Sequence, residues 1–344
     1  MKAIATLSEI LTLAGSQFKV YDMGRIISKI PTQHFYKMET AAQPYPTPVA
    51  GYARIALCFW SIQTPDTPYI WFIQFPVDEQ GYIKLAARDQ FLQLVITALG
   101  QDLSKTPDDS HAKALANNPC IFKPDEQKLA FFNAHLKVDL DLNASKYYEH
   151  AQSFLQGNLG WEEWSSVALQ GLADVTARLD REDNNQKLCH ALPYLNKTIW
   201  VTLAQLLEHQ PLDQQLTHCI CQLHQQWLKE QHPLSHMLLR AMASSPFNTL
   251  RQQALQRELT VSKDPQLFIA IAGRLWADLN NETINKTFFE ALAKLHDQTL
   301  FNQLFADLVA IPMLREQMLT RLRDPNRSPD LAMAIGQLIQ ATHG

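Results

Sequence analysis

The second half of the chain is a series of amphipathic segments separated by prolines, and this pattern constrains the fold more than any other feature. From Trp161 onward, apolar residues recur at helical spacing in segments of about 11 to 18 residues. The separating residues are Pro193, Pro211, Pro233, Pro246, Pro265, Pro312, Pro325 and Pro329. The predicted helices lie near residues 161–179, 184–195, 198–209, 212–230, 234–243, 247–259, 265–279, 283–295, 298–309, 311–323 and 328–341. We therefore expect residues 161–344 to form an all-α domain.

Taken in pairs, these helices repeat every 30 to 36 residues or so, which is typical of two-helix repeats that stack into a solenoid. No consensus residue recurs, so an irregular helical bundle remains an alternative. The segment 246–279, PFNTLRQQALQRELTVSKDPQLFIAIAGRLWADL, resembles a degenerate HEAT repeat. This resemblance implies a HEAT-like α-solenoid with an extended concave surface.

The first part of the chain predicts an α+β domain that covers residues 1–103. Residues 69–75 alternate as a strand, with Trp71, Ile73 and Phe75 on one face. Gly81 can take the positive φ of a turn, so residues 82–85 are expected to return as a hairpin partner, before a helix with Phe91 in its apolar stripe.

Further strands are expected at residues 18–22, 25–30 and 52–62, with helices near residues 4–13 and 32–38. Strands and helices segregated in this way favour a mainly antiparallel sheet with helices on one face. Residues 104–160 are expected to be a linker and connecting helices, because the stretch 104–118 is polar and residues 128–136 and 147–155 have helical periodicity.

Composition bears on location and on partners. The net charge of -4 argues against a protein that mainly coats nucleic acid or an anionic membrane. Five scattered cysteines fit reduced thiols in the cytoplasm, and no apolar run reaches the roughly 18 residues of a membrane span. With only 11 glycines and no glycine-rich phosphate loop, we expect no cofactor.

Three stretches carry a resemblance to a known family. They are VYDMGR at residues 20–25, PYP at residues 44–46, and FPVDEQGYIKLAARDQF at residues 75–91. In these stretches the chain resembles a gammaproteobacterial family of uncharacterised proteins of similar length, a domain of unknown function. The resemblance implies that the chain is one unit, and it brings no activity, cofactor or partner.

Four charged residues are the candidate binding site of the first domain: Asp22, Arg25, Arg88 and Asp89. Each acid and base lies where a strand meets a turn or a helix, and functional groups are often displayed at such junctions. The alternative is that they form helix caps and surface ion pairs, which contribute less than ~1 kcal/mol. The two pairs would form one patch if both turns lie at the same end of the sheet.

Other candidate chemistry is weaker. His218, Cys219, Cys221 and His224 have ligand types, but three-residue steps fan them around a helix, so no metal site is expected. Adjacent helical residues such as Cys189 and His190 point about 100° apart and cannot act together as nucleophile and base. Glu162 and Glu163 diverge for the same reason, and a solvated first helical turn explains them.

These observations favour a non-catalytic protein that binds or scaffolds a partner protein through a concave helical-repeat surface and an N-terminal α+β module. One alternative is a nucleic-acid-associated HEAT-like protein. A less favoured one is an enzyme with a charged site at Asp22, Arg25, Arg88 and Asp89. The basic residues behind the nucleic-acid alternative are Arg240, Arg251, Arg257, Arg274, Arg315, Arg321, Arg323 and Arg327, and nearly as many acids accompany them.

Overall fold

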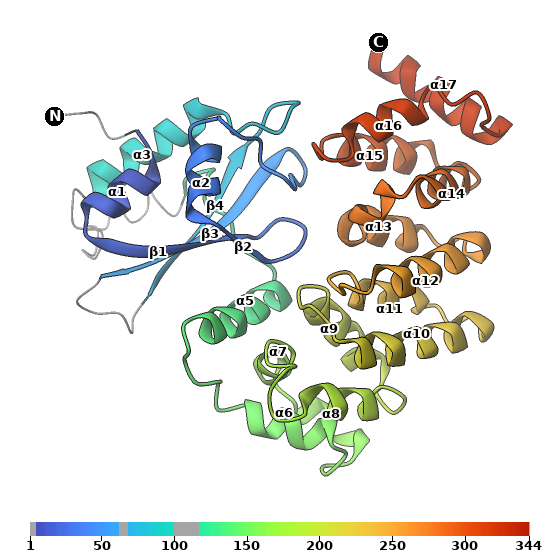
Figure 1. The fold of residues 1–344 in the computed structure, drawn as a ribbon, viewed down its shortest axis with the longest axis horizontal. Helices are drawn as coiled ribbons and strands as arrows, with labels where there is room; N and C mark the ends of the chain where they lie inside the picture. The colour runs from blue at the N-terminus through green and yellow to red at the C-terminus, as the bar shows by residue number, and fades with distance from the viewer. Residues whose placement is uncertain (1–4, 62–67, 100–116, 344) are drawn as a thin grey trace. The chain divides into compact units, whose positions relative to one another are not determined.

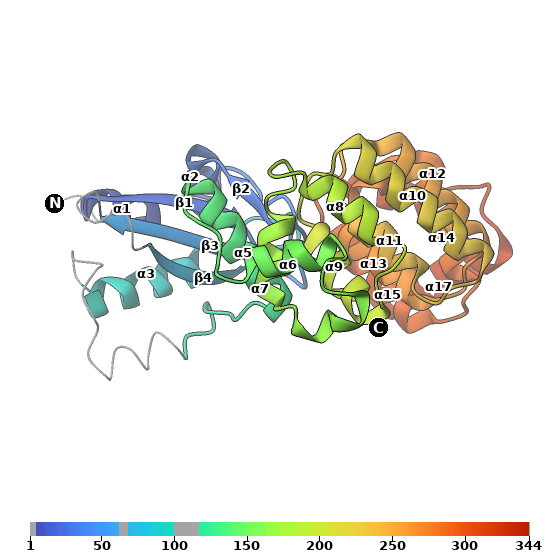
Figure 2. The ribbon, with the colours of Figure 1, turned by 90° about the horizontal axis from the view of Figure 1, so that it is seen from below.

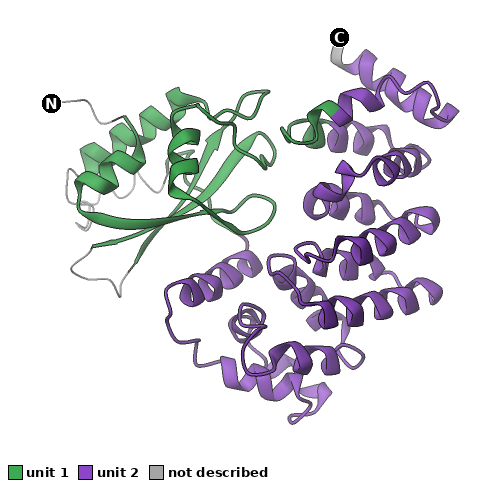
Figure 3. Cartoon of the chain, viewed as in Figure 1, with its two compact units in different colours: residues 1–124, 306–316 green, residues 125–305, 317–344 purple. Residues whose placement is uncertain are grey.

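A computed structural model describes residues 5–61, 68–99 and 117–343 of the chain. It divides into two compact units (Figure 3): unit 1 comprises residues 1–124 and 306–316, and unit 2 comprises residues 125–305 and 317–344. The sequence analysis predicted domain boundaries at residues 103 and 160. In the structure, unit 2 begins at Asp125, so it includes the helices that were expected to connect the two domains. The expected linker at residues 104–118 lies almost entirely outside the described residues.

Unit 1 contains a four-stranded sheet and helices, as expected for an α+β domain (Figure 1). Its elements are α1 (Leu7–Leu13), β1 (Ser16–Asp22), β2 (Ser28–Ile30), α2 (Thr32–Glu39), β3 (Tyr52–Ser61), β4 (Tyr69–Pro76) and α3 (Leu85–Leu99). The strand order is β2-β1-β3-β4, and every neighbouring pair is antiparallel. The second strand is shorter than expected, since pairing begins only at Ser28.

The hairpin partner of β4 differs from the sequence prediction. β4 pairs along its length with β3, for example Ala56 opposite Phe72. Gly81 does have the expected positive φ, 88°, but the returning segment forms only one bridge, between Val77 and Ile83. The return strand is cut short because α3 already begins at Leu85.

Three helices cover one face of this sheet. Apolar side chains from α1, α2 and α3 share a core with alternate residues of β3 and β4, among them Leu57 and Phe75. Each large side chain buried in this way stabilises the fold by roughly 1.5–3 kcal/mol. The alternation read from the sequence is confirmed, since Trp71, Ile73 and Phe75 all contact this core.

Unit 2 is helical throughout its described residues. Its elements are α5 (Glu126–Asp139), α6 (Tyr148–Leu155), the 3-10 helix η1 (Trp161–Ser166), α7 (Leu169–Thr176), α8 (Asn184–Ala191), α9 (Lys197–Leu207), α10 (Gln214–Lys229), α11 (Ser235–Ala241), α12 (Asn248–Val261), α13 (Pro265–Arg274), the 3-10 helix η2 (Trp276–Asn280), α14 (Glu282–Ala293), α15 (Gln298–Val309), α16 (Arg315–Arg321) and α17 (Pro329–His343). The expected helices at residues 161–179 and 265–279 are each broken into a 3-10 and an α-helical part. Short polar side chains begin many of these helices, for instance Asp213, whose carboxylate accepts from the Leu216 N–H at 2.7 Å.

From α5 to α12, each α-helix of unit 2 contacts the second α-helix that follows it in the chain. One series of contacts runs through α5, α7, α9, α11 and α13, and the other through α6, α8, α10, α12 and α14. Figure 2 shows α8, α10, α12 and α14 side by side. The helix pairs therefore stack in two layers, the arrangement that a repeat of two helices requires.

Buried polar side chains join successive pairs at the spacing of this repeat. Glu208 at the end of α9 accepts from Arg240, 32 residues on, and from the Nε of Arg274, 66 residues on. His224 and Glu258 are 34 residues apart and 2.8 Å from each other. A carboxylate buried this deeply requires such partners, because desolvation of an unpaired charge is costly.

Candidate functional site

Asp22 and Arg25, the first two residues of the expected site, are buried. The Asp22 carboxylate accepts from the Gly24 N–H at 2.6 Å, from the Tyr45 hydroxyl at 2.6 Å and from the Thr47 hydroxyl. Glycine at position 24 leaves room for this contact, because the Cβ of any other residue would lie 2.9 Å from Asp22 Oδ1. Burial, followed by the charge of Asp22, raises the pKa of Tyr45 well above its usual range, so the phenol remains a donor.

The Arg25 guanidinium donates to the Pro48 carbonyl at 2.8 Å and lies 2.9 Å from the Asp307 carboxylate. Asp307 lies at the end of α15, where residues 306–309 belong to unit 1 although the rest of that helix belongs to unit 2. Arg25 is 1% exposed. A buried guanidinium with two such acceptors holds a loop in place and offers little to a ligand in solution.

Arg88 and Asp89 lie in a second environment, around Glu39 at the end of α2. Arg88 is buried, donates to the Glu39 carbonyl and forms an ion pair with Asp89 at 2.6 Å. The Glu39 carboxylate accepts from the Leu7 N–H at 2.7 Å and the Ser8 N–H at 3.1 Å, and so caps α1. Burial raises the pKa of Glu39, and the bonds from Ser8 and Leu7 and the charge of Arg88 partly offset this effect.

The two candidate pairs therefore have separate sets of partners, and of the four side chains only that of Asp89 is more than half exposed, at 56%. The sequence could identify these residues as charged and near turns, but chain position does not reveal burial.

The histidines and cysteines of α10 point in different directions. His218 is exposed and lies 3.0 Å from the Gln222 amide, whereas His224 is fully buried against Glu258. The Cys221 sulfur lies 3.4 Å from that of Met242. Within the described residues, no group of three or more His, Cys, Asp or Glu side chains converges as metal ligands would.

A cleft with a volume of about 790 Å³ lies at the ends of α10 and α12. We call it the basic cleft and define it by Trp227, Lys229, His232, Arg257, Val261 and Lys263. The ring of His232 stacks on Trp227 with centroids 4.0 Å apart, which gives the cleft one flat aromatic wall. The Val261 side chain is 66% exposed.

Charge in the basic cleft is one-sided. Its lining includes the cations Lys229, Arg257 and Lys263 but a single acid, Asp264. Asp264 caps α13 and lies 3.5 Å from His236. Burial lowers the pKa of His236 although Asp264 opposes the shift, so at neutral pH this contact is to a largely neutral imidazole.

None of the three cleft cations forms an ion pair or a side-chain hydrogen bond among the described residues. Arginines elsewhere in unit 2 behave differently: Arg178, Arg240 and Arg251 all pair with buried carboxylates. The cations of the basic cleft are therefore not required to neutralise buried acids of the fold.

A buried polar network supports the cleft from beneath. The Ser235 hydroxyl, part of the lining, donates to Glu258, whose other oxygen lies 2.8 Å from His224 Nε2. His224 Nδ1 is buried and has no hydrogen-bond partner in the part of the chain that the structure describes. This network fixes the start of α11 against α12.

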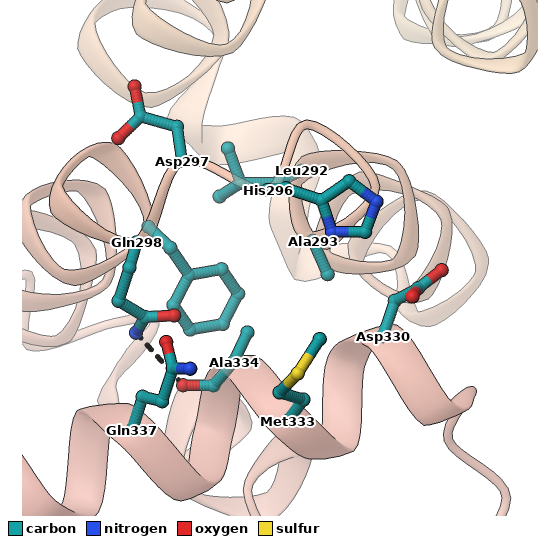
Figure 4. Close-up of a pocket in the computed structure, with 10 residues that line it drawn as sticks. Leu292, Ala293, His296, Asp297, Gln298, Asp330, Met333, Ala334 and Gln337 are labelled. Carbon is teal, nitrogen blue, oxygen red and sulfur yellow. Dashed lines mark hydrogen bonds between the residues drawn. The ribbon is translucent and has the colours of Figure 1, made fainter.

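A smaller pocket of about 190 Å³ lies between the end of α14 and α17 (Figure 4). Two of its polar side chains are engaged: Gln298 donates to the Ala334 carbonyl at 3.0 Å, and Asp297 accepts from the Leu300 N–H. Asp297 points away from the centre of the pocket in Figure 4. The pocket offers less volume than the basic cleft.

Sequence reasoning missed the basic cleft because its cations come from three separate places. Lys229 ends α10, Arg257 lies in α12, and Lys263 precedes α13. The available signal was the repeat spacing: Lys229 and Lys263 each lie within four residues before a proline that separates two helices, Pro233 and Pro265.

Three findings bear on the class of protein. No helix among the described residues is long and apolar enough to cross a membrane. No curated protein and no solved structure matches the chain significantly. A family described as protein of unknown function, DUF3549, matches residues 2–339, so the predicted membership in a family of unknown function is confirmed and the chain belongs to DUF3549.

Proposed function

We propose that this protein is a non-catalytic binding protein, which recognises a partner protein through its helical unit and remains in the cytoplasm. The two-layer stacking of alternate helices is the observation that carries the proposal. Such stacks, of which HEAT repeats are one type, present an extended surface that binds polypeptides without any catalytic group. All five cysteines are free thiols, which supports the cytoplasmic location.

The burial of three of the four charged candidates argues against catalysis at these residues. The former candidates Asp22, Arg25 and Arg88 are buried and engaged in local contacts. A catalytic group must instead reach a reacting atom. An enzyme at these residues is therefore the least favoured function.

Nucleic-acid binding remains the second candidate, but the internal ion pairs of several arginines weaken it. Arg240, Arg251, Arg274 and Arg321 all form internal ion pairs. Phosphate binding needs cations that are free to displace counterions. The cations left for that role in the basic cleft are few.

Affinity capture with the full-length protein, followed by reconstitution, tests the proposal. Native extract is treated with nuclease or left untreated, and captured proteins are identified by mass spectrometry. A captured protein that is then purified and binds saturably in isothermal titration calorimetry supports the function. Capture that disappears with nuclease supports nucleic-acid association, and the absence of any saturable protein partner overturns the proposal.

A further inference from the structure

The chemistry of the basic cleft identifies the kind of segment that fits it, provided that the proposed binding function holds. The cleft combines a flat aromatic wall, one exposed valine and three cations. Its cations outnumber the single acid of the lining, Asp264, and they have no partners of their own among the described residues. A ligand for this surface should therefore carry negative charges and an apolar group.

Helix dipoles account for only part of this charge. Lys229 stands in the last turn of α10, where a cation offsets the negative helix end, and Arg257 lies near the end of α12. Lys263 lies beyond α12 and directly before Asp264, the N-cap of α13, where a cation is unfavourable to the helix. The dipole of α13 therefore does not account for the position of Lys263.

The apolar part of the cleft is similarly open. Val261 is two-thirds exposed at the end of α12, beside the polar residues Thr260 and Ser262 of the same lining. The Trp227 ring is largely buried, so its stack with His232 forms a firm wall and not a mobile side chain. A leucine-sized side chain between acidic residues would cover Val261 while its neighbours reach the cations.

We propose that the basic cleft binds an acidic, extended segment of a partner protein, with an apolar residue against Val261 and carboxylates beside Lys229, Arg257 and Lys263. Charge complementarity selects this ligand over a neutral peptide. The aromatic wall is narrow and single, whereas single-stranded nucleic acid is held by several stacking platforms along a groove. A protein segment is therefore the occupant to which we commit.

Fluorescence anisotropy tests the ligand class directly. The probes are a fluorescein-labelled peptide of repeating Glu-Glu-Leu, a matched Gln-Gln-Leu peptide and a single-stranded oligonucleotide, each titrated with full-length protein. We expect saturable binding of the acidic peptide alone, weakening as salt rises from about 50 to 300 mM. No saturation by about 1 mM protein, or tighter binding of either other probe, overturns the proposal.

Charge-reversed variants locate the site. Lys229→Glu with Arg257→Glu and Lys263→Glu should weaken binding of the acidic peptide at least about tenfold. The matched control reverses three exposed cations elsewhere in unit 2, Lys197, Lys286 and Lys294, and should retain most of the affinity. Equal loss in both variants means that net charge alone drives binding, which overturns the site.

The apolar contact has its own variant. Val261→Ser should weaken binding of the Glu-Glu-Leu peptide several-fold and leave a Glu-Glu-Ser peptide unchanged; equal effects on both overturn the apolar contact. The captured partner separates this inference from the function on which it rests. A partner that still binds the cleft variant overturns the cleft alone, whereas the absence of any partner overturns the function.

Discussion

Asp22 and Asp89 both belong to candidate pairs with an arginine, yet their surroundings differ greatly. Asp22 is 4% exposed and accepts three hydrogen bonds, whereas the Asp89 side chain is 56% exposed. Loss of a buried acceptor leaves its donors unsatisfied, while loss of an exposed carboxylate returns its partner to water. The two aspartates should therefore respond very differently to the same substitution.

We predict that Asp22→Ala lowers the free energy of unfolding by about 2–4 kcal/mol, because the Tyr45 hydroxyl and the Gly24 N–H lose their acceptor. Asp89→Ala should lower it by less than about 1 kcal/mol, since an exposed ion pair contributes little. Urea unfolding followed by circular dichroism measures both. Equal losses for the two variants would contradict the prediction.

His209 gives a pH-dependent contribution. Burial, and then the nearby cations Lys128, Arg274 and Arg240, lower its pKa well below the usual value. Its contact with Glu208 at 3.4 Å is therefore made by a neutral imidazole and is not an ion pair. The unfolded chain takes up a proton near pH 6.5 where the folded chain does not, so stability is present above pH 6.5 and is lost as pH falls.

We predict that His209→Gln reduces the loss of stability below pH 6.5, by up to about 1.4 kcal/mol per pH unit. Chemical unfolding repeated between pH 7 and about pH 5 gives the slope. His150→Gln is the control, because His150 is exposed and should leave the slope unchanged. A His209→Gln slope equal to that of the unaltered protein would show that the fold does not lower the pKa of His209.

At the scale of single elements, the sequence predicted what depends on local pattern. The positions of α10 and α12, the face of β4 that carries Trp71, and the turn at Gly81 were all readable from spacing. The pairing of β4 with β3 could not be predicted, because strand pairing depends on contacts between segments that are separate in the sequence. The burial of Arg25 was also unreadable, since its acceptor Pro48 lies 23 residues away in sequence.

The Glu208 contact joins α9, α11 and α13 and tests how such polar links stabilise the stack. We predict that Glu208→Ala costs about 3–5 kcal/mol, because Arg240 and Arg274 lose their shared carboxylate. Glu208→Leu with Arg240→Met and Arg274→Met should cost less than the single change, since no charge is then left without its partner. Thermal and urea unfolding compare the variants.

Glu230→Ala is the matched control for that series, because Glu230 is exposed and binds only the Gln226 amide of the same helix end. It should change stability by less than about 1 kcal/mol. A triple variant less stable than Glu208→Ala would show that the charged link itself stabilises the stack.

For the whole molecule, we predict that prolonged chelation leaves the melting temperature unchanged. A structural zinc would supply on the order of 10 kcal/mol of folding free energy, so its removal would be evident. Differential scanning calorimetry with and without chelator measures the effect. Stoichiometric zinc in the purified protein, found by elemental analysis, would contradict the prediction.

The candidate site was less predictable than the fold for a reason of scale. Lys229 and Lys263 line one cleft only because α10 and α12 stack. That contact joins successive helix pairs, so no short sequence motif contains both residues. The sequence contains the helices and the charges, but the alignment of successive helix ends arises from tertiary packing. Asp22 and Asp89 could be predicted as candidates because their position at a junction is visible in the local sequence pattern alone.

The spacing of the polar links in unit 2 also has a mechanical consequence. A link such as that between His224 and Glu258 reaches only the neighbouring helix pair, whereas Glu208 also reaches Arg274, one pair further along. A load applied along the stack would therefore be carried by a series of similar, separately breakable connections. We expect such a stack to extend by small shifts between neighbouring helix pairs before any single pair unfolds.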